Sequence, residues 1–285
     1  MKKIGFIDHC IDEWHANNYP RMIRESSRKG MFEVALAWDE ARKEGKKSLG
    51  EWCAWQKVAG AASIEQIVAE CDCIVVLSPD NPEEHERLSD LPLRSGKPVC
   101  IDKPFAPTLA AARRLFAKAE EYSTPLMSSS ALRFGSALES ALGNELAGQK
   151  ANFAAIQGAG KFQVYAVHQL EMLVMLMGPG ARRVMQYSLP DGQLMLVDYG
   201  AGRMGTVNLL PRHPFRCSAQ YGPGKSLAIN EMADFFPRFI EAMLAFFDTG
   251  QSPVPKQETL EVAALLEAGA SALARPGEWV DVGAI

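Results

Sequence analysis

Residues 71–115 read CDCIVVLSPDNPEEHERLSDLPLRSGKPVCIDKPFAPTLAAARRL. Two apolar runs within this stretch, at 71–79 and 97–102, have unbroken hydrophobic cores, which is typical of strands buried on both faces of a parallel sheet. After Thr108, a candidate helix cap, apolar residues recur at helical spacing up to position 119. This alternation of strand and helix patterns predicts βαβ units.

The same alternation extends toward the N-terminus. Residues 3–8 and 32–38 predict two further strands, and residues 63–70 predict a short helix. A helix is expected from about residue 18 to 28, because Pro20 is tolerated in a first helical turn and Gly30 is well placed as a stop. This assignment leaves a long connection between residues 8 and 17.

Beyond Arg133 the pattern changes to strand-like runs in succession, separated by Gly, Pro and Asp turns. The runs are ANFAAI, RRVMQYSL, QLMLVDYG, RMGTVNLL and PFRCSAQY, and helices are expected at 167–177, 231–247 and 257–273. The sequence therefore predicts an α/β domain with a parallel sheet at 1–130, followed by an α+β domain with a mostly antiparallel open sheet at 131–285.

Length and composition support this division. A chain of 285 residues is long enough for two packed units, and 47% hydrophobic with 22% charged residues is ordinary for a globular protein. Thirty Lys and Arg residues against 34 Asp and Glu residues give a net charge of −4, without a long basic run. We therefore expect no nucleic-acid partner.

Apolar runs and cysteines bear on the compartment. The N-terminal MKKIGFID has too short an apolar run for a signal peptide, and residues 172–177 fall far below the roughly 20 apolar residues of a spanning helix. Six scattered cysteines fit reduced core thiols better than a disulfide framework. A cytoplasmic protein without a membrane partner is expected.

Three ordered segments carry a resemblance to a known family. Residues 77–115 contain a strand followed by Ser-Pro, His, Gly-Lys-x-Val and Asp-Lys-Pro. Together with AVHQLEMLVMLMG at 166–178 and PRFIEAMLAFFDTGQSPVP at 237–255, this order resembles the glucose-fructose oxidoreductase, inositol dehydrogenase and MocA (Gfo/Idh/MocA) oxidoreductases. The resemblance spans the whole chain and implies a Rossmann domain joined to an open-sheet domain.

The resemblance also implies an activity. It suggests hydride transfer between NAD or NADP and a carbinol carbon of a small-molecule substrate, a sugar, polyol or related hydroxy compound, in a homodimer or higher homo-oligomer. Lys103 would contact the substrate hydroxyl and the nicotinamide, and His168 would act as general acid/base. An imidazole has the near-neutral pKa that this proton transfer needs, and an ammonium would stabilise the developing alkoxide. The positions expected around the cofactor are Ile7, Asp8, His9, Asp39, Ser78, Pro79, His85, Asp102 and Lys103.

The sequence departs from the family pattern at two motifs. Asp8, Cys10 and Glu13 occupy the three glycine positions of the dinucleotide fingerprint, so side chains and carboxylates stand where the backbone should approach a diphosphate. Val164 replaces the aspartate expected four residues before His168. Other polar partners for the imidazole are Glu171, one helical turn along, and Tyr165.

Several alternative interpretations stay open at this point. The protein is either an oxidoreductase or a non-catalytic sugar-derivative-binding or regulatory protein of the same fold that has lost dinucleotide binding. Asp39 is either a ribose ligand or a plain acid at a strand end. His85 either orders the loop near the nicotinamide or lies on a surface helix.

The cluster Asp8, His9, Asp12 and His15 invites a metal interpretation, which we disfavour because two histidines on an irregular loop have no defined ligand geometry. The alternative is that Asp12 and Glu13 cap backbone amides that a diphosphate would otherwise occupy. The serines at 128–130 are candidates to line the site, but no Gly-x-Ser-x-Gly elbow surrounds them.

Overall fold

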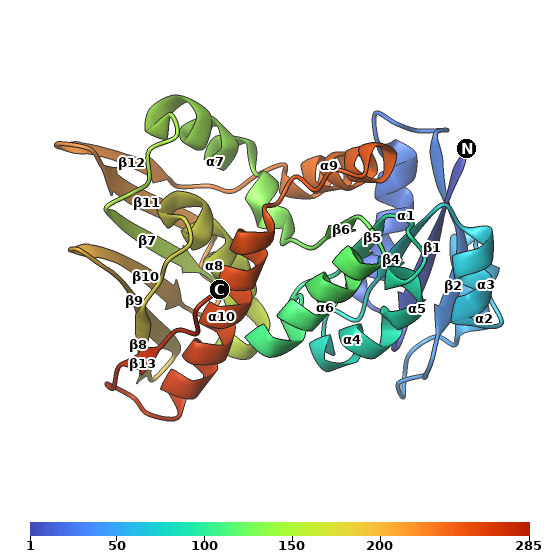
Figure 1. The fold of residues 1–285 in the computed structure, drawn as a ribbon, viewed down its shortest axis with the longest axis horizontal. Coiled ribbons are helices and arrows are strands. Elements are labelled where there is room, and N and C mark those ends of the chain that lie inside the picture. The colour runs from blue at the N-terminus through green and yellow to red at the C-terminus, as the bar shows by residue number, and fades with distance from the viewer. The chain divides into compact units, whose positions relative to one another are not determined.

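The computed structural model describes residues 1–285, which divide into two compact units. The first unit comprises Met1–Ala106, Ala110–Ser128 and Ile240–Val254, and the second comprises Pro107–Leu109, Ser129–Phe239 and Pro255–Ile285. Each unit contains one sheet and its covering helices, whose labels are shown in Figure 1.

The sheet of the first unit is six-stranded and entirely parallel, in the order β3-β2-β1-β4-β5-β6. Its strands are β1 (Lys2–Asp8), β2 (Phe32–Asp39), β3 (Ala59–Gly60), β4 (Cys73–Val76), β5 (Val99–Ile101) and β6 (Leu126–Met127). Strands β4 and β5 are wholly buried, as their unbroken apolar runs predict. The predicted Rossmann-like parallel sheet is confirmed.

The helices of this unit are α1 (Trp14–Glu25), α2 (Leu49–Gln56), α3 (Ile64–Glu70), α4 (His85–Leu88), α5 (Asp90–Leu93), most of α6 (Leu109–Glu121) and most of α9 (Phe235–Thr249), with a 3-10 turn η1 at Pro82–Glu84. Helix α2 was not predicted from the sequence. It begins with a capping box in which the Ser48 and Glu51 side chains each bond the other's backbone amide. The predicted helix at 231–247 begins four residues later, at Phe235.

Helix α1 corrects the predicted helix at 18–28. It begins at Trp14 and ends at Glu25, so Pro20 lies inside it and Gly30 is not its stop. An interior proline removes a helical hydrogen bond. The loss is tolerated because Glu13 caps the N-terminus and the inner face, including Ala16, Tyr19 and Ile23, is buried. The connection after β1 is therefore short, at residues 9–13.

The sheet of the second unit has seven strands in the order β12-β11-β7-β10-β9-β8-β13. Its strands are β7 (Phe153–Gly158), β8 (Arg183–Leu189), β9 (Gly192–Gly200), β10 (Arg203–Leu209), β11 (Arg216–Tyr221), β12 (Lys225–Ile229) and β13 (Val280–Asp281). Only the central pair, β7 and β10, is parallel. The predicted mostly antiparallel sheet is confirmed, with β12 and β13 added to the predicted strands.

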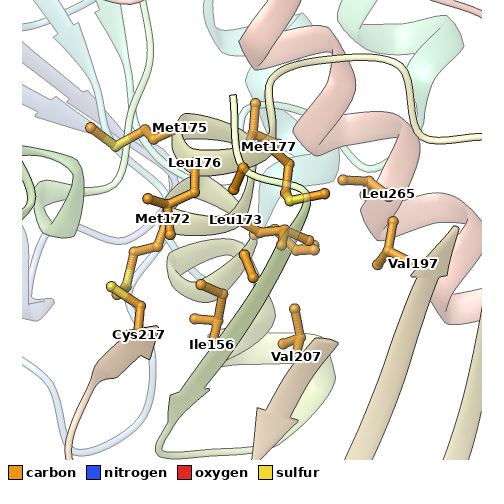
Figure 2. Packing of buried hydrophobic residues seen from close by; sticks show 14 of the residues in the cluster. Ile156, Met172, Leu173, Met175, Leu176, Met177, Val197, Val207, Cys217 and Leu265 are labelled. Atoms are coloured by element: carbon orange, nitrogen blue, oxygen red, sulfur yellow. The ribbon is translucent and has the colours of Figure 1, made fainter. Parts of the chain in front are cut away.

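Two long helices, α8 (Phe162–Met177) and α10 (Lys256–Leu273), pack on this sheet and on each other. Helix α8 begins five residues before the predicted residue 167. Figure 2 shows how its residues Met172, Leu173 and Leu176 meet side chains of the strands, among them Ile156 and Val207. The methionine-rich run is thus core packing, as predicted. The remaining helices of the unit are η2 (Ala131–Phe134), α7 (Ser136–Ser140) and the π-helical η3 (Ala141–Leu146).

Two further features of the structure are the state of the cysteines and the length of the helices. All six cysteines are buried and free of disulfides, in agreement with the prediction of core thiols. No helix combines the length and the apolar character that crossing a bilayer requires.

Candidate active site

The carboxyl edge of the parallel sheet gathers most of the predicted cofactor positions. The chain passes from β1 outward through β2 and β3, then returns to β4 on the other side of β1. Ligands of such sheets bind at the carboxyl ends of the strands where the order reverses. Asp8 ends β1, beside Asp39 on β2, while Ser78 and Asp102 follow β4 and β5. Ile7 lies in β1 and is fully buried.

Asp8 is sealed into this edge. It is 1% exposed, and its Oδ1 accepts hydrogen bonds from the Cys10 amide (3.0 Å) and the Ser78 hydroxyl (3.0 Å). Its Oδ2 is buried without a hydrogen-bond partner. Burial, with a smaller contribution from the Asp102 charge, raises the pKa of Asp8 to about 7. Asp8 is therefore partly protonated at neutral pH.

Glu13 lies at the N-terminus of α1. Its carboxylate accepts hydrogen bonds from the amides of His15 (2.7 Å) and Ala16. These first-turn amides have no partner within the helix, and together with the helix dipole they attract an anion. Burial, joined by the charges of Asp8 and Asp102, raises the pKa of Glu13 well above its ordinary value.

Further side chains tie the 9–13 loop to its surroundings. Asp12 accepts hydrogen bonds from the Lys47 amide (2.8 Å) and the Asn17 side chain (2.9 Å), and Asn17 in turn accepts from the Trp52 indole (2.8 Å). Asp39 accepts from the Ile11 amide (3.3 Å). Glu13 caps amides at the α1 N-terminus, as that alternative expects, whereas Asp12 bonds the Lys47 amide outside α1. Asp39 likewise bonds within the protein. Burial raises the pKa of Asp39.

Asp102 and Lys103 form the segment after β5. Asp102 forms a buried ion pair with His15 Nδ1, and it accepts the Lys103 amide (2.7 Å). Although burial alone would raise it, the His15 charge and hydrogen bond, with the Lys103 charge, lower the pKa of Asp102 to about 2. Lys103 is only 9% exposed, and its ammonium has no hydrogen-bond or ion-pair partner in the protein. The pairing of His15 with Asp102 was not foreseen.

His85 joins two of these loops. It is completely buried, which rules out the surface-helix interpretation. Its Nε2 lies 2.7 Å from the Leu77 carbonyl oxygen and its Nδ1 3.0 Å from that of Phe105. Burial lowers the pKa of His85. His85 thus fixes the Ser78-Pro79 loop against the loop that carries Lys103.

The loop histidines diverge instead of sharing a ligand. His9 Nδ1 lies 2.9 Å from the Glu40 carboxylate, whereas His15 bonds Asp102. The structure contains no group of three or more His, Cys, Asp or Glu side chains arranged to hold a metal ion. The disfavoured metal interpretation gains no support from these contacts.

A nicotinamide dinucleotide is the cofactor that the resemblance implies, and such a fold places the diphosphate at the α1 N-terminus. The amides of His15 and Ala16 at this N-terminus already donate to Glu13. Asp8 and Glu13 add carboxylates at two of the fingerprint positions, and Cys10 fills the third. As they stand, these residues do not fit a diphosphate.

The second unit holds the other predicted catalytic residues. His168 lies on α8, and its Nδ1 is 2.7 Å from the Ser130 hydroxyl oxygen. The Tyr165 ring lies beside the imidazole, with centroids 5.8 Å apart, and the Phe215 ring meets it edge-on. Val164, at the position of the family's aspartate, is exposed. The Ser130 hydroxyl is thus a group that can orient the imidazole through Nδ1.

Behind Ser130 lies a buried ion-pair cluster. Glu171 accepts hydrogen bonds from the Ser130 amide (3.2 Å) and from Arg133 (2.7 Å). Arg133 also donates to Glu258 of α10 at 2.6 Å, and its remaining guanidinium nitrogen is buried without a partner. Glu171 therefore positions Ser130. Arg133 and Glu258 were not predicted, and the only signal in the sequence is a lone arginine within the apolar run ALRF.

Comparison with known proteins begins with the first unit. Residues 13–130 match the model of an oxidoreductase family with an NAD-binding Rossmann fold (GFO_IDH_MocA). This range contains the Asp102-Lys103-Pro104 motif and ends at Ser130. No curated protein matches the chain in sequence.

Solved structures match the whole chain in fold at low identity. A probable dehydrogenase from Thermotoga maritima has a TM-score of 0.78 at 13% identity, covering 98% of this chain and 98% of its own. A putative myo-inositol dehydrogenase from Sinorhizobium meliloti 1021 has 0.78 at 13%, covering 99% and 100%. The WlbA dehydrogenase from Bordetella pertussis, in complex with NADH and UDP-GlcNAcA, has 0.77 at 15%, covering 99% of each chain. The predicted resemblance is therefore confirmed: residues 13–130 match the family's sequence model, and the whole chain shares its fold with solved structures named as dehydrogenases.

Proposed function

We propose that the protein is an oxidoreductase acting at a carbinol carbon of a sugar, polyol or related hydroxy compound. The match of residues 13–130 to an oxidoreductase family carries this proposal. The substrate class is supported by structural neighbours that are named for inositol and for UDP-N-acetylglucosamine.

In this proposal His168 takes the proton of the reacting hydroxyl, since Ser130 orients the imidazole through Nδ1. By the family resemblance, the Lys103 ammonium of the first unit, which forms no hydrogen bond or ion pair, would stabilise the developing alkoxide. Tyr165 contributes a polar wall beside the imidazole. Oxidation of a carbinol also needs a hydride acceptor, which in this family is a nicotinamide, and the turn at residues 8–13 does not fit its diphosphate as it stands.

The test is turnover of a panel of inositols, aldoses and UDP-amino sugars with millimolar NAD+ or NADP+, followed by the absorbance of the reduced nicotinamide. The His168→Asn variant should lose about 100-fold or more in kcat. The matched control is His213→Asn, which changes an exposed histidine of the same unit and should leave kcat unchanged. Full activity in His168→Asn would remove the imidazole from the mechanism.

A second candidate is a binding protein of the same fold without turnover. One observation favours it: Glu13 bonds the α1 amides that a diphosphate needs. This protein would show a rise in Tm with a compound of the panel but no nicotinamide reduction at any cofactor concentration. Turnover with any substrate would exclude it.

A further inference from the structure

The α1 N-terminus already binds an anion, and that anion belongs to the chain. Glu13 is the N-cap of a 12-residue helix, and its two carboxylate oxygens accept the amides of residues 15 and 16. A diphosphate at this position of the fold uses the same kind of donor, helix N-terminal amides. The two anions therefore compete for one set of hydrogen bonds.

A second feature of the same turn points in the same direction. Asp8 lies close enough to Glu13 for its charge to act on that carboxyl, and its Oδ2 is buried without a partner. Asp102 acts on Glu13 as well, but its charge is countered by His15. An incoming diphosphate would meet these carboxylates in a partly desolvated place, where repulsion between like charges is strong.

Glu13 is held by fewer parts of the chain than the other two carboxyl groups. Asp8 and Asp102 are buried and hydrogen-bonded to neighbouring strands and loops, whereas Glu13 is partly exposed and bonds only the helix that it caps. Rotation of Glu13 into solvent would release two amides without disturbing the loop contacts of Asp12 and Asp39. Of the acidic groups in the turn, Glu13 is thus the one whose removal opens the anion position.

From this geometry we infer that Glu13 is a built-in occupant of the anion position, an internal carboxylate that stands where a dinucleotide's diphosphate would bind. Dinucleotide binding by this chain requires Glu13 to leave the α1 N-terminus. The inference takes its ligand class from the proposed function, but it concerns binding and not turnover.

The experiment measures binding of NADH and of ADP-ribose to the full-length protein by titration calorimetry. We expect dissociation constants of about millimolar or weaker in the wild type. In Glu13→Gly, which removes charge and volume, both ligands should bind at least tenfold more tightly. Glycine is an acceptable N-cap, so α1 should remain folded, and circular dichroism checks this. Glu13→Gln, which removes the charge alone, should gain affinity to a smaller degree.

The matched control is Glu51→Gln, which removes an acidic side chain from the first turn of α2 and should leave both affinities within twofold of wild type. Micromolar binding by the wild type, or no gain in folded Glu13→Gly, would overturn the inference. These results are separable from the proposed function. Tighter binding of NADH by Glu13→Gly without turnover of any substrate would refute only the proposed activity. Turnover by a wild type that binds NADH tightly would refute only the inference that Glu13 occupies the anion position.

Discussion

The two units differ in how their buried carboxyl groups are bonded. In the first, the carboxyls of Asp8 and Glu13 lie near Asp102, and neither of them forms an ion pair, whereas Asp102 bonds His15. In the second, Arg133 lies between two carboxylates and bonds both. Burial raises the pKa of Asp8 and Glu13, which have no ion-pair partner, so the charge of these two groups depends on pH.

The pKa directions follow this contrast. Burial raises the pKa of Asp8 to about 7 and that of Glu13 well above its ordinary value, because little positive charge opposes it. For Arg133 burial acts to lower the pKa, but Glu171 and Glu258 outweigh it and raise the pKa. We therefore expect the stability contributed by Asp8 and Glu13 to change with pH. The stability contributed by Arg133, Glu171 and Glu258 should change chiefly when one of these partners is removed.

The largest effect is expected from Arg133→Met. This change replaces the arginine by an unbranched apolar side chain and leaves Glu171 and Glu258 without their shared cation. Removal of one partner from a buried pair costs about 3–5 kcal/mol, because the remaining charge is buried and uncompensated. Urea denaturation of the full chain should show this loss in the free energy of unfolding. The control, Arg183→Met, breaks a pair with Asp198 in which the arginine side chain is 46% exposed, and should cost less than about 1 kcal/mol. Equal losses in both variants would refute the contrast.

The architecture could be predicted from the sequence because each helix or strand is marked by the spacing of apolar residues within its own segment. The apolar runs at 71–79 and 97–102 became β4 and β5, and the predicted order of strands and helices after Arg133 was found as expected. The start of α1 was missed because Pro20 was placed in the first turn, whereas Glu13 and the buried inner face hold the helix in spite of it. The capping-box pattern Ser-x-x-Glu at 48–51 was present in the sequence and would have revealed α2.

The site was predicted only where it follows a motif or a strand end. Asp8, Asp39 and Asp102 lie at neighbouring strand ends because parallel strands bring their carboxyl ends to one edge. Hydrogen-bonded partners in the second unit are far apart in the sequence: Ser130 and His168 are separated by 38 residues, and Arg133 and Glu258 by 125. Such pairs depend on helix packing, and no spacing in the sequence encodes them.

A pH-dependent effect is expected from Asp8→Asn, which keeps the shape of the side chain and cannot ionise. In the folded protein the pKa of Asp8 is about 7, against an ordinary 3.8. Its contribution to stability is therefore complete below about pH 4 and is lost as the pH rises toward 7, because the unfolded chain then ionises more readily. Asp8→Asn should match wild type near pH 4 and be more stable by about 2–4 kcal/mol near pH 8.

Urea denaturation at several pH values measures this difference. The control is Asp191→Asn, in the exposed turn between β8 and β9, which should leave the pH dependence of stability unchanged. A pH dependence of stability in Asp8→Asn that is parallel to that of wild type would mean that the pKa of Asp8 is the same in the folded and the unfolded protein. A positive charge near Asp8 would then offset the effect of burial on its pKa, and the contrast between the two units would fail.

The smallest effect is expected from Ser130→Ala, which removes the hydrogen bond to His168 Nδ1 and the side-chain cap of η2. The expected cost is about 1 kcal/mol in stability, since each lost contact is a single neutral hydrogen bond. The diagnostic readout is the nitrogen NMR spectrum of the imidazole, whose tautomer balance should change because the group that fixes Nδ1 is gone. Ser129→Ala removes a neighbouring buried hydroxyl that bonds a carbonyl and should leave this spectrum as in wild type. An unchanged spectrum in Ser130→Ala would mean that the Ser130 hydroxyl does not set the tautomer of His168. The ion pairs of Arg133, which hold Glu171 against Ser130, would then have no influence on the imidazole by this route.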